Sequence, residues 1–138
     1  MGGIAAATRF PPERAAVLAR ASERAGVAVI TNFDDTGTAY AILDRHDILR
    51  RVGSVVVSEA VGLRKPHPVL VRLALRDLGT PASGALMVGD NFVEDVGAAH
   101  AAGVDAAWID VGDRGVPPTL APPRYVVRSF AEVAALLD

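Results

Sequence analysis

The hydrophobic and polar positions divide the chain into short apolar runs separated by stretches with helical spacing. Apolar runs at residues 27–30, 55–57, 85–88, 106–109 and 125–127 predict five strands. Between them, apolar residues recur every three or four positions, which predicts helices. Strands that are apolar on both faces and alternate with helices are typical of a parallel sheet covered on both sides. The pattern therefore predicts a three-layer, Rossmann-like α/β fold.

Local signals indicate where the helices begin and end. Pro11, Pro12 and Glu13 open a helix that runs to Arg24, and Gly26 can end it as a left-handed residue. Ser129 with Glu132 forms a capping box for the last helix. Three further helices are expected. One begins near Thr38, one contains Leu70 and ends at Gly79, and one contains Val96 and ends at Gly103.

Composition and charge exclude several classes of function. The 138 residues show no linker, so we expect one domain over residues 1–138, and 51% hydrophobic residues argue against disorder. A net charge of −2 without a basic tract predicts no nucleic-acid or membrane partner. The absence of cysteine excludes disulfides and thiol catalysis and fits a cytoplasmic protein. No apolar run reaches the roughly 20 residues of a membrane span.

Polar side chains follow the predicted strands at the ends where α/β sheets bind ligands. Thr31 and Asn32 end the first of these strands, and a hydroxyl beside exposed backbone N–H groups suits an anionic oxygen. The alternative is that both side chains only satisfy the backbone of a turn. Lys65 lies between the second predicted strand and the next helix, and Pro66 and Pro68 stiffen its surroundings. A fixed ammonium near the strand ends would neutralise a phosphoryl group; the alternative is a solvated lysine, as most lysines are.

The segment after the third predicted strand offers two carboxylates. Asp90 and Asp95 lie in the sequence Gly-Asp-Asn-Phe-Val-Glu-Asp. Magnesium prefers carboxylate oxygens, with waters and substrate phosphate completing its shell, so Asp90 is a candidate ligand and Asp95 a candidate support behind it. The alternative is an N-cap at Asp90 and a solvated helix acid at Asp95.

Three motifs occur in order, each at or just after a strand end. They are Ile30-Thr31-Asn32-Phe33-Asp34-Asp35-Thr36, the segment from Ser58 through Lys65 to Pro68, and Val88-Gly89-Asp90-Asn91 continuing to Asp95. Together they resemble the second, third and fourth motifs of haloacid-dehalogenase-like (HAD) hydrolases. The resemblance covers nearly the whole chain from Gly26 onward.

The resemblance implies phosphoryl chemistry through an aspartyl-enzyme intermediate, with Mg²⁺ as cofactor and a small phosphorylated substrate, or less often a halogenated one. Thr31 and Asn32 would bind the phosphoryl group, and Lys65 would pair with both the nucleophile and the phosphate. Asp90 would bind the metal, and Asp95 would orient that site.

The chain departs from the family at the first motif, which should supply the nucleophilic aspartate. It contains no Asp-x-Asp sequence, and Asp34 and Asp35 are adjacent and come after the second motif, so we expect them to be polar loop residues near the mouth of the cleft. The missing strand should lie between the strands that end at Thr31 and Gly89, and residues 1–10 look too short to supply it or the family's cap. We therefore expect an inactive, partial HAD core, or alternatively a degenerate binding domain.

The expected gap in the sheet bears on stability. Strands on either side of it would lose backbone partners, and each buried group left unpaired costs about 1–3 kcal/mol. We expect an isolated chain to be marginally stable, to self-associate through its exposed strand edges, or to recruit a strand from a partner. Gly3 to Ala7 are an alternative source of that strand, but this segment is short and alanine-rich, so we do not expect it to fill the gap.

Overall fold

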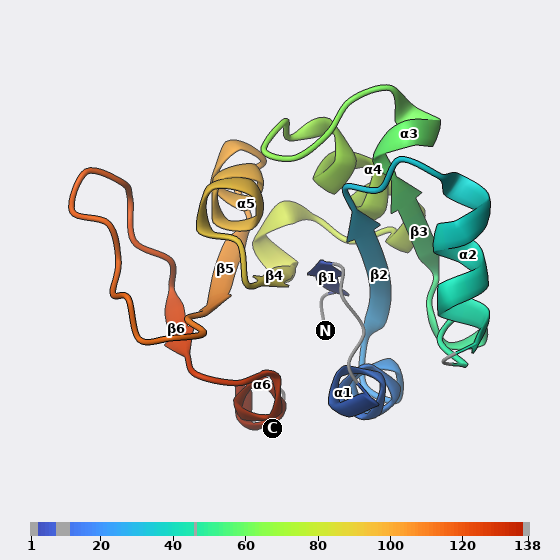
Figure 1. Cartoon of the computed structure of the whole chain (residues 1–138), viewed down its shortest axis with the longest axis horizontal. Helices are drawn as coiled ribbons and strands as arrows, with labels where there is room; N and C mark the ends of the chain where they lie inside the picture. Colours follow the sequence, from blue (N-terminus) through green and yellow to red (C-terminus); the bar gives the residue numbers. More distant parts are fainter. Residues whose placement is uncertain (1–2, 8–11, 46, 137–138) are drawn as a thin grey trace.

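The computed structural model describes residues 3–7, 12–45 and 47–136, with backbone alone for residues 3–7 and 12–15. Six parallel strands form one sheet in the order β3-β2-β1-β4-β5-β6 (Figure 1). This confirms the three-layer α/β fold expected from the apolar runs. The strands are β1 Gly3–Ala7, β2 Gly26–Thr31, β3 Ser54–Val57, β4 Leu86–Gly89, β5 Asp105–Ile109 and β6 Tyr125–Val127.

The strand β1 fills the central position that we expected to be empty. It pairs in parallel with β2, from Gly3 opposite Gly26 to Ala7 opposite Ile30, and with β4, where Ala5 lies opposite Met87. The expectation that residues 1–10 are too short to supply a strand is therefore wrong. The expected location, between β2 and β4, is confirmed, and the strand found there carries no carboxylate. The predicted loss of pairing partners by β2 and β4 does not occur.

Helices cover both faces of the sheet (Figure 1). One buried cluster includes Leu18 of α1, Leu43 of α2 and Phe130 of α6. The cluster on the other face includes Leu70 of α4 and Ala99 of α5. The helical segments are α1 Pro12–Ser22, α2 Thr36–Arg45, η1 Leu49–Arg51, α3 Ser58–Val61, α4 Val69–Leu78, η2 Ala82–Gly84, η3 Phe92–Val96, α5 Gly97–Ala101 and α6 Phe130–Leu136, of which η1 and η2 are 3₁₀ turns and η3 is a π-helical turn.

The helix boundaries predicted at Gly79, Gly103 and Ser129 are confirmed, whereas the helix end predicted at Gly26 is wrong. Gly79 and Gly103 both have positive φ, at 62° and 74°, as a left-handed helix end requires. Ser129 Oγ accepts the Glu132 N–H at 3.4 Å. Gly26, however, is the first residue of β2, because α1 already ends at Ser22 and a turn follows. Pro11 lies outside the described residues.

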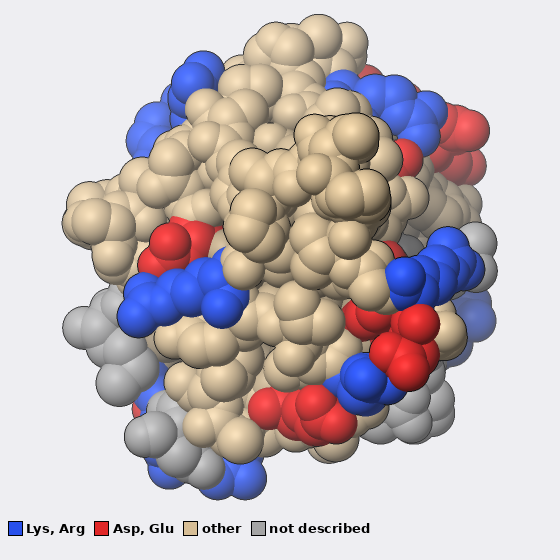
Figure 2. Space-filling view, turned by 90° about the vertical axis from the view of Figure 1, so that its left-hand side faces the viewer, with Lys and Arg blue, Asp and Glu red and all other residues tan. Residues whose placement is uncertain are grey.

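The strands β3 and β6 form the two edges of the sheet. Self-association through strand edges would involve these two strands, and it remains a prediction. Residues 110–124 link β5 to β6, and the side of the molecule that carries this link is largely uncharged at its centre, with charged side chains towards the margin (Figure 2). Within the described part of the chain, no helix is long and apolar enough to span a bilayer.

Candidate active site

The carboxyl end of β2 is joined to the segment before α4 by a two-way amide contact. The Asn32 Nδ2 group donates to the Lys65 carbonyl at 3.1 Å, and the Lys65 N–H donates to Asn32 Oδ1 at 2.8 Å. A primary amide can satisfy a backbone donor and acceptor at once, as here. Asn32 therefore positions the backbone of Lys65, which agrees with the alternative that its side chain satisfies backbone groups.

The side chain of Lys65 points inward and forms a buried ion pair. Its Nζ lies 2.6 Å from Asp95 Oδ1, and both side chains are only 2% exposed. The other Asp95 oxygen accepts the Asn91 N–H at 3.0 Å. Burial raises the pKa of Asp95, while the Lys65 ammonium and the Asn91 N–H act in the opposite direction. Asp95 is thus a buried partner of Lys65, and the alternative of a solvated helix acid is wrong.

Gly89 allows Asp95 to approach the end of β4. A Cβ atom at Gly89 would lie 2.1 Å from Asp95 Oδ2 and 2.3 Å from its Cγ, closer than nonbonded atoms can stand. The backbone at Gly89 is in an extended strand, so space and not conformation requires glycine here. The packing of Asp95 against this strand end was not evident from the sequence, because Gly and Asp are six positions apart.

Thr31 carries a buried hydroxyl that has no hydrogen-bond partner within the described part of the chain. The residue is 1% exposed at the last position of β2, and its Oγ1 forms no hydrogen bond with any described residue. Most buried polar atoms have a partner in the protein or in ordered water, because an unpaired one costs about 1–3 kcal/mol. The hydroxyl fits a site for an anionic oxygen.

Asp90 lies one residue beyond β4 and its side chain is exposed. Its carbonyl accepts the Trp108 Nε1–H at 3.2 Å, which fixes the backbone at this point. Among the described residues no group of three or more potential ligands gathers as a protein-only metal site. The residues fit the arrangement that is usual for magnesium, in which one solvent-exposed carboxylate binds the ion and water and substrate phosphate take the remaining positions.

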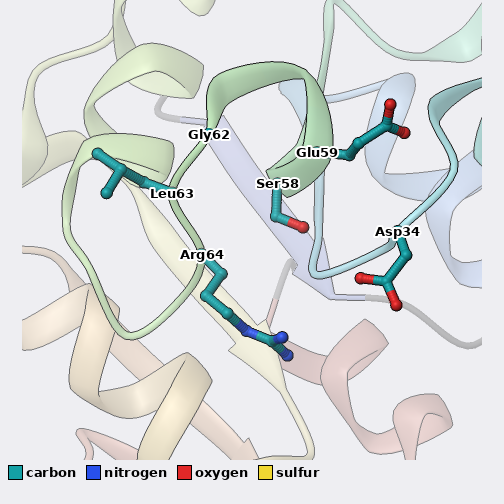
Figure 3. A pocket seen from close by; sticks show the side chains of 6 residues that line it. All are labelled: Asp34, Ser58, Glu59, Gly62, Leu63 and Arg64. Carbon is teal, nitrogen blue, oxygen red and sulfur yellow. The ribbon is translucent and has the colours of Figure 1, made fainter.

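A pocket of about 290 Å³ opens between the segments that follow β2 and β3. Figure 3 shows the side chains that line it: Asp34, Ser58, Glu59, Gly62, Leu63 and Arg64. None of the predicted site residues lines the pocket. Sequence reasoning missed Arg64 and treated Asp34 as a loop residue, although each lies within two positions of Lys65 or Asn32.

Two of the neighbouring polar residues have structural roles. Ser58 Oγ accepts the Phe33 N–H at 3.0 Å and donates to the Phe33 carbonyl at 3.1 Å, as expected for a structural serine. Asp35 Oδ1 accepts the Thr38 N–H at 3.1 Å near the start of α2, and contacts with Thr38 hold the pKa of Asp35 below its usual value. These contacts fix the segments that frame the pocket.

Comparison with known proteins agrees with this architecture. A family model described as HAD-hydrolase-like matches residues 62–133. Phosphoserine phosphatase of Thermus thermophilus is 37% identical over 122 residues, which cover 83% of this chain and 47% of that protein. Phosphoglycolate phosphatase of Rhodospirillum rubrum is 35% identical over 109 residues, which cover 79% of this chain and 44% of that protein.

A solved structure of 2-haloacid dehalogenase from Pseudomonas syringae superimposes with a TM-score of 0.77 at 23% identity, covering 94% of this chain and 53% of that one. The chain therefore spans about half the length of the curated relatives that it matches. The order of strands, the polar residues at their carboxyl ends and the matched family model lead to one conclusion: this chain belongs to the HAD-like hydrolase family.

Proposed function

We propose that this chain is the core of a phosphatase-type hydrolase and binds the phosphoryl group of a small phosphorylated metabolite. The proposal rests on the buried Lys65–Asp95 pair, together with the buried Thr31 hydroxyl at the end of β2, which has no hydrogen-bond partner among the described residues. Phosphoserine and phosphoglycolate phosphatases among the relatives support a small metabolite as substrate.

Each proposed binding residue has a donor to offer. The Lys65 ammonium has three N–H donors, and Asp95 occupies one of them, so a phosphoryl oxygen can take another. The Thr31 hydroxyl would donate to a second oxygen. Asn32 would act through the backbone of Lys65, which it holds by two hydrogen bonds. In this arrangement Lys65 neutralises charge that grows on the phosphoryl group, and Asp95 keeps the ammonium in position.

Asp90 would hold magnesium, and Asp95 would stay behind it as the partner of Lys65. When bound, the metal would neutralise phosphoryl charge and align the group for attack. The chain's own contribution is to keep the Asp90 backbone fixed by the Trp108 hydrogen bond, with the carboxylate exposed.

These 138 residues should bind phosphate without hydrolysing esters. They contain no Asp-x-Asp sequence, and β1 at the centre of the sheet reads Gly-Ile-Ala-Ala-Ala. A missing nucleophile costs many orders of magnitude in covalent catalysis. The second candidate function, a non-catalytic binding domain, is favoured by the same strand, because β1 completes the sheet without supplying a nucleophile.

Replacing Thr31 by valine tests the phosphate site, because the two roles of the hydroxyl predict different results. Valine keeps the shape and removes the unpaired oxygen, so the free protein should gain about 1 kcal/mol of stability. If the hydroxyl binds phosphate, calorimetric titration with inorganic phosphate and Mg²⁺ should show binding weakened by about tenfold, as for a hydrogen bond to a charged group.

The matched control is Thr119→Val, at an exposed position of the 110–124 segment. It should change neither stability nor phosphate binding. A Thr31→Val variant that is more stable and binds phosphate as well as the unmodified chain would contradict the proposed site.

A further inference from the structure

We propose that the pocket beside Lys65 binds the leaving-group half of the substrate and selects a zwitterionic alcohol, so that the preferred ligands are phosphate esters of small hydroxy amino acids. This inference rests on the proposed function, since it places the phosphoryl group at Thr31 and Lys65. It adds a substrate class, which follows from the charges that line the pocket.

Chain neighbours of the proposed phosphate-binding residues line the pocket. Arg64 is the chain neighbour of Lys65, and Asp34 is two residues beyond Asn32, whose side chain holds the Lys65 backbone. Arg64 Nη2 also lies 3.9 Å from Glu94 Oε2, which places the guanidinium next to the segment that carries Asp95. An ester whose phosphoryl group contacts Lys65 would therefore extend its alcohol part into this pocket.

Two of the polar side chains in the pocket are already occupied. Ser58 Oγ is bonded to both backbone groups of Phe33. Glu59 Oε2 accepts from the Thr36 N–H at 2.5 Å and from Thr36 Oγ1 at 3.0 Å. In Figure 3 the Glu59 carboxylate points away from the Arg64 guanidinium. Neither residue is available to recognise a ligand without giving up these contacts.

The charges that remain for a ligand are those of Asp34 and Arg64. Asp34 forms no hydrogen bond or ion pair with any residue that the structure describes, and Arg64 has only the long contact to Glu94. Figure 3 shows the Asp34 carboxylate and the Arg64 guanidinium extending to the same side of the pocket. They form no direct ion pair within the described chain, so a ligand can lie between them.

One carboxylate and one guanidinium on the same pocket favour a ligand that carries both an ammonium and a carboxylate. A purely anionic alcohol would gain from Arg64 but meet repulsion from Asp34, and a purely cationic one would meet the reverse. A volume of about 290 Å³ suits a small molecule of this kind.

Binding of four phosphate esters to the intact chain tests this selectivity. Isothermal titration in the presence of Mg²⁺ would use O-phospho-L-serine, phosphoethanolamine, phosphoglycolate and ethyl phosphate, with inorganic phosphate as the reference. We expect phosphoserine to bind about fivefold more tightly than phosphoglycolate, which lacks the ammonium, or phosphoethanolamine, which lacks the carboxylate. Fivefold corresponds to one exposed ion pair at the upper end of its usual range.

Two substitutions should each remove the preference that depends on one charged side chain of the pocket. Asp34→Asn should abolish the advantage of phosphoserine over phosphoglycolate, and Arg64→Gln should abolish its advantage over phosphoethanolamine. The controls Asp44→Asn and Arg76→Gln change the net charge equally at exposed positions on α2 and α4, away from the pocket, and should preserve both preferences.

The outcomes separate this inference from the function on which it rests. Tight binding of inorganic phosphate with equal affinity for all four esters would overturn the inference and leave the phosphate site standing. If Asp34→Asn and Asp44→Asn lose the preference equally, net charge alone explains the selectivity, and the inference is also overturned. Failure of inorganic phosphate to bind would remove the proposed function, and the inference with it.

Discussion

The two central strands, β1 and β4, lie side by side in the sheet but differ in what they contribute. β1 is held by parallel pairing to β2 and β4, and its sequence Gly-Ile-Ala-Ala-Ala offers no ionisable group. β4 ends at Gly89 and leads into the segment that carries Asp95, whose buried carboxylate contacts the Lys65 ammonium and the Asn91 N–H. The comparison shows that a strand without ionisable side chains can complete the sheet, whereas the candidate chemistry depends on the side chains that follow a strand end.

The largest expected effect concerns the network after β4. Lys65→Met leaves the Asp95 carboxylate buried without its ammonium partner, so the free energy of unfolding should fall by about 3–5 kcal/mol. Urea denaturation measures this loss. Adding Asp95→Asn should recover part of it, because the neutral amide no longer needs a counter-charge.

A cost below about 1 kcal/mol for Lys65→Met would show that the pair contributes little to the fold. Failure of the double variant to recover any stability would show that lost packing, and not the unpaired carboxylate, causes the damage.

The contribution of β1 can be tested by removing a backbone donor. Ala5 pairs with Ala28 on one side and Met87 on the other, and proline cannot donate to a ladder in a central strand. Ala5→Pro should therefore lower the free energy of unfolding by about 2 kcal/mol or more, as for the loss of buried hydrogen bonds. Ala121→Pro, at an exposed position outside every described helix and strand, is the control.

If Ala5→Pro and Ala121→Pro have the same stability as the unmodified chain, β1 does not hold the sheet together. The sheet would then tolerate loss of its central strand, against the pairing described above.

Local sequence predicted most of the fold because the five apolar strands carry their own signal. Val126, in the last of them, belongs to a run whose predicted bounds, 125–127, match β6. β1 was missed because glycine and alanine have low strand propensity, and only tertiary pairing with two neighbours makes Gly3–Ala7 a strand. Gly26 was misassigned because the sequence does not reveal that α1 ends early.

The candidate site was predictable as a set of residues but not as a set of contacts. Thr31, Lys65 and Asp90 stand out because each follows a predicted strand. That Lys65 pairs with Asp95, and that Asn32 holds the Lys65 backbone, depends on segments about 30 residues apart meeting in space. Asp34 was expected near the mouth of the cleft and does line the pocket, whereas no role was expected for Arg64, although it lies in the motif that contains Lys65.

A smaller effect is expected from Gly89→Ala, which tests how closely the network packs against β4. The new Cβ would overlap Asp95 Oδ2, 2.1 Å away, and the resulting shift should cost about 1–3 kcal/mol. Gly37→Ala is the matched control, because its Cβ would meet Asp35 Oδ1 at an ordinary 3.5 Å and alanine favours a helix such as α2. Thermal unfolding of both variants would show the difference, and equal melting temperatures would contradict the close approach.

The smallest expected effect is a pH dependence at the end of β5. Burial favours a raised pKa for Asp110, but N–H groups of Arg114 and Gly115, at 2.9 Å and 2.8 Å, and nearby arginines hold the pKa below its ordinary value of 3.8. A lowered folded pKa means that the carboxylate stabilises the fold above the unfolded pKa, and that this stability is lost as pH falls through the folded pKa. Asp110→Asn should flatten the acid side of the stability curve below about pH 4, and an unchanged curve would contradict this role.

Phosphorus NMR of a phosphate monoester mixed with the 138-residue chain and Mg²⁺ tests the central claim most directly, because one spectrum reports both binding and turnover. We predict that the ester resonance shifts or broadens with the unmodified chain, less so with Thr31→Val, and that no inorganic phosphate accumulates above the protein-free rate. An ester signal unaffected by the protein would contradict the binding site. Growth of an inorganic phosphate signal that disappears in Asp90→Ala would contradict the claim that these residues lack a nucleophile.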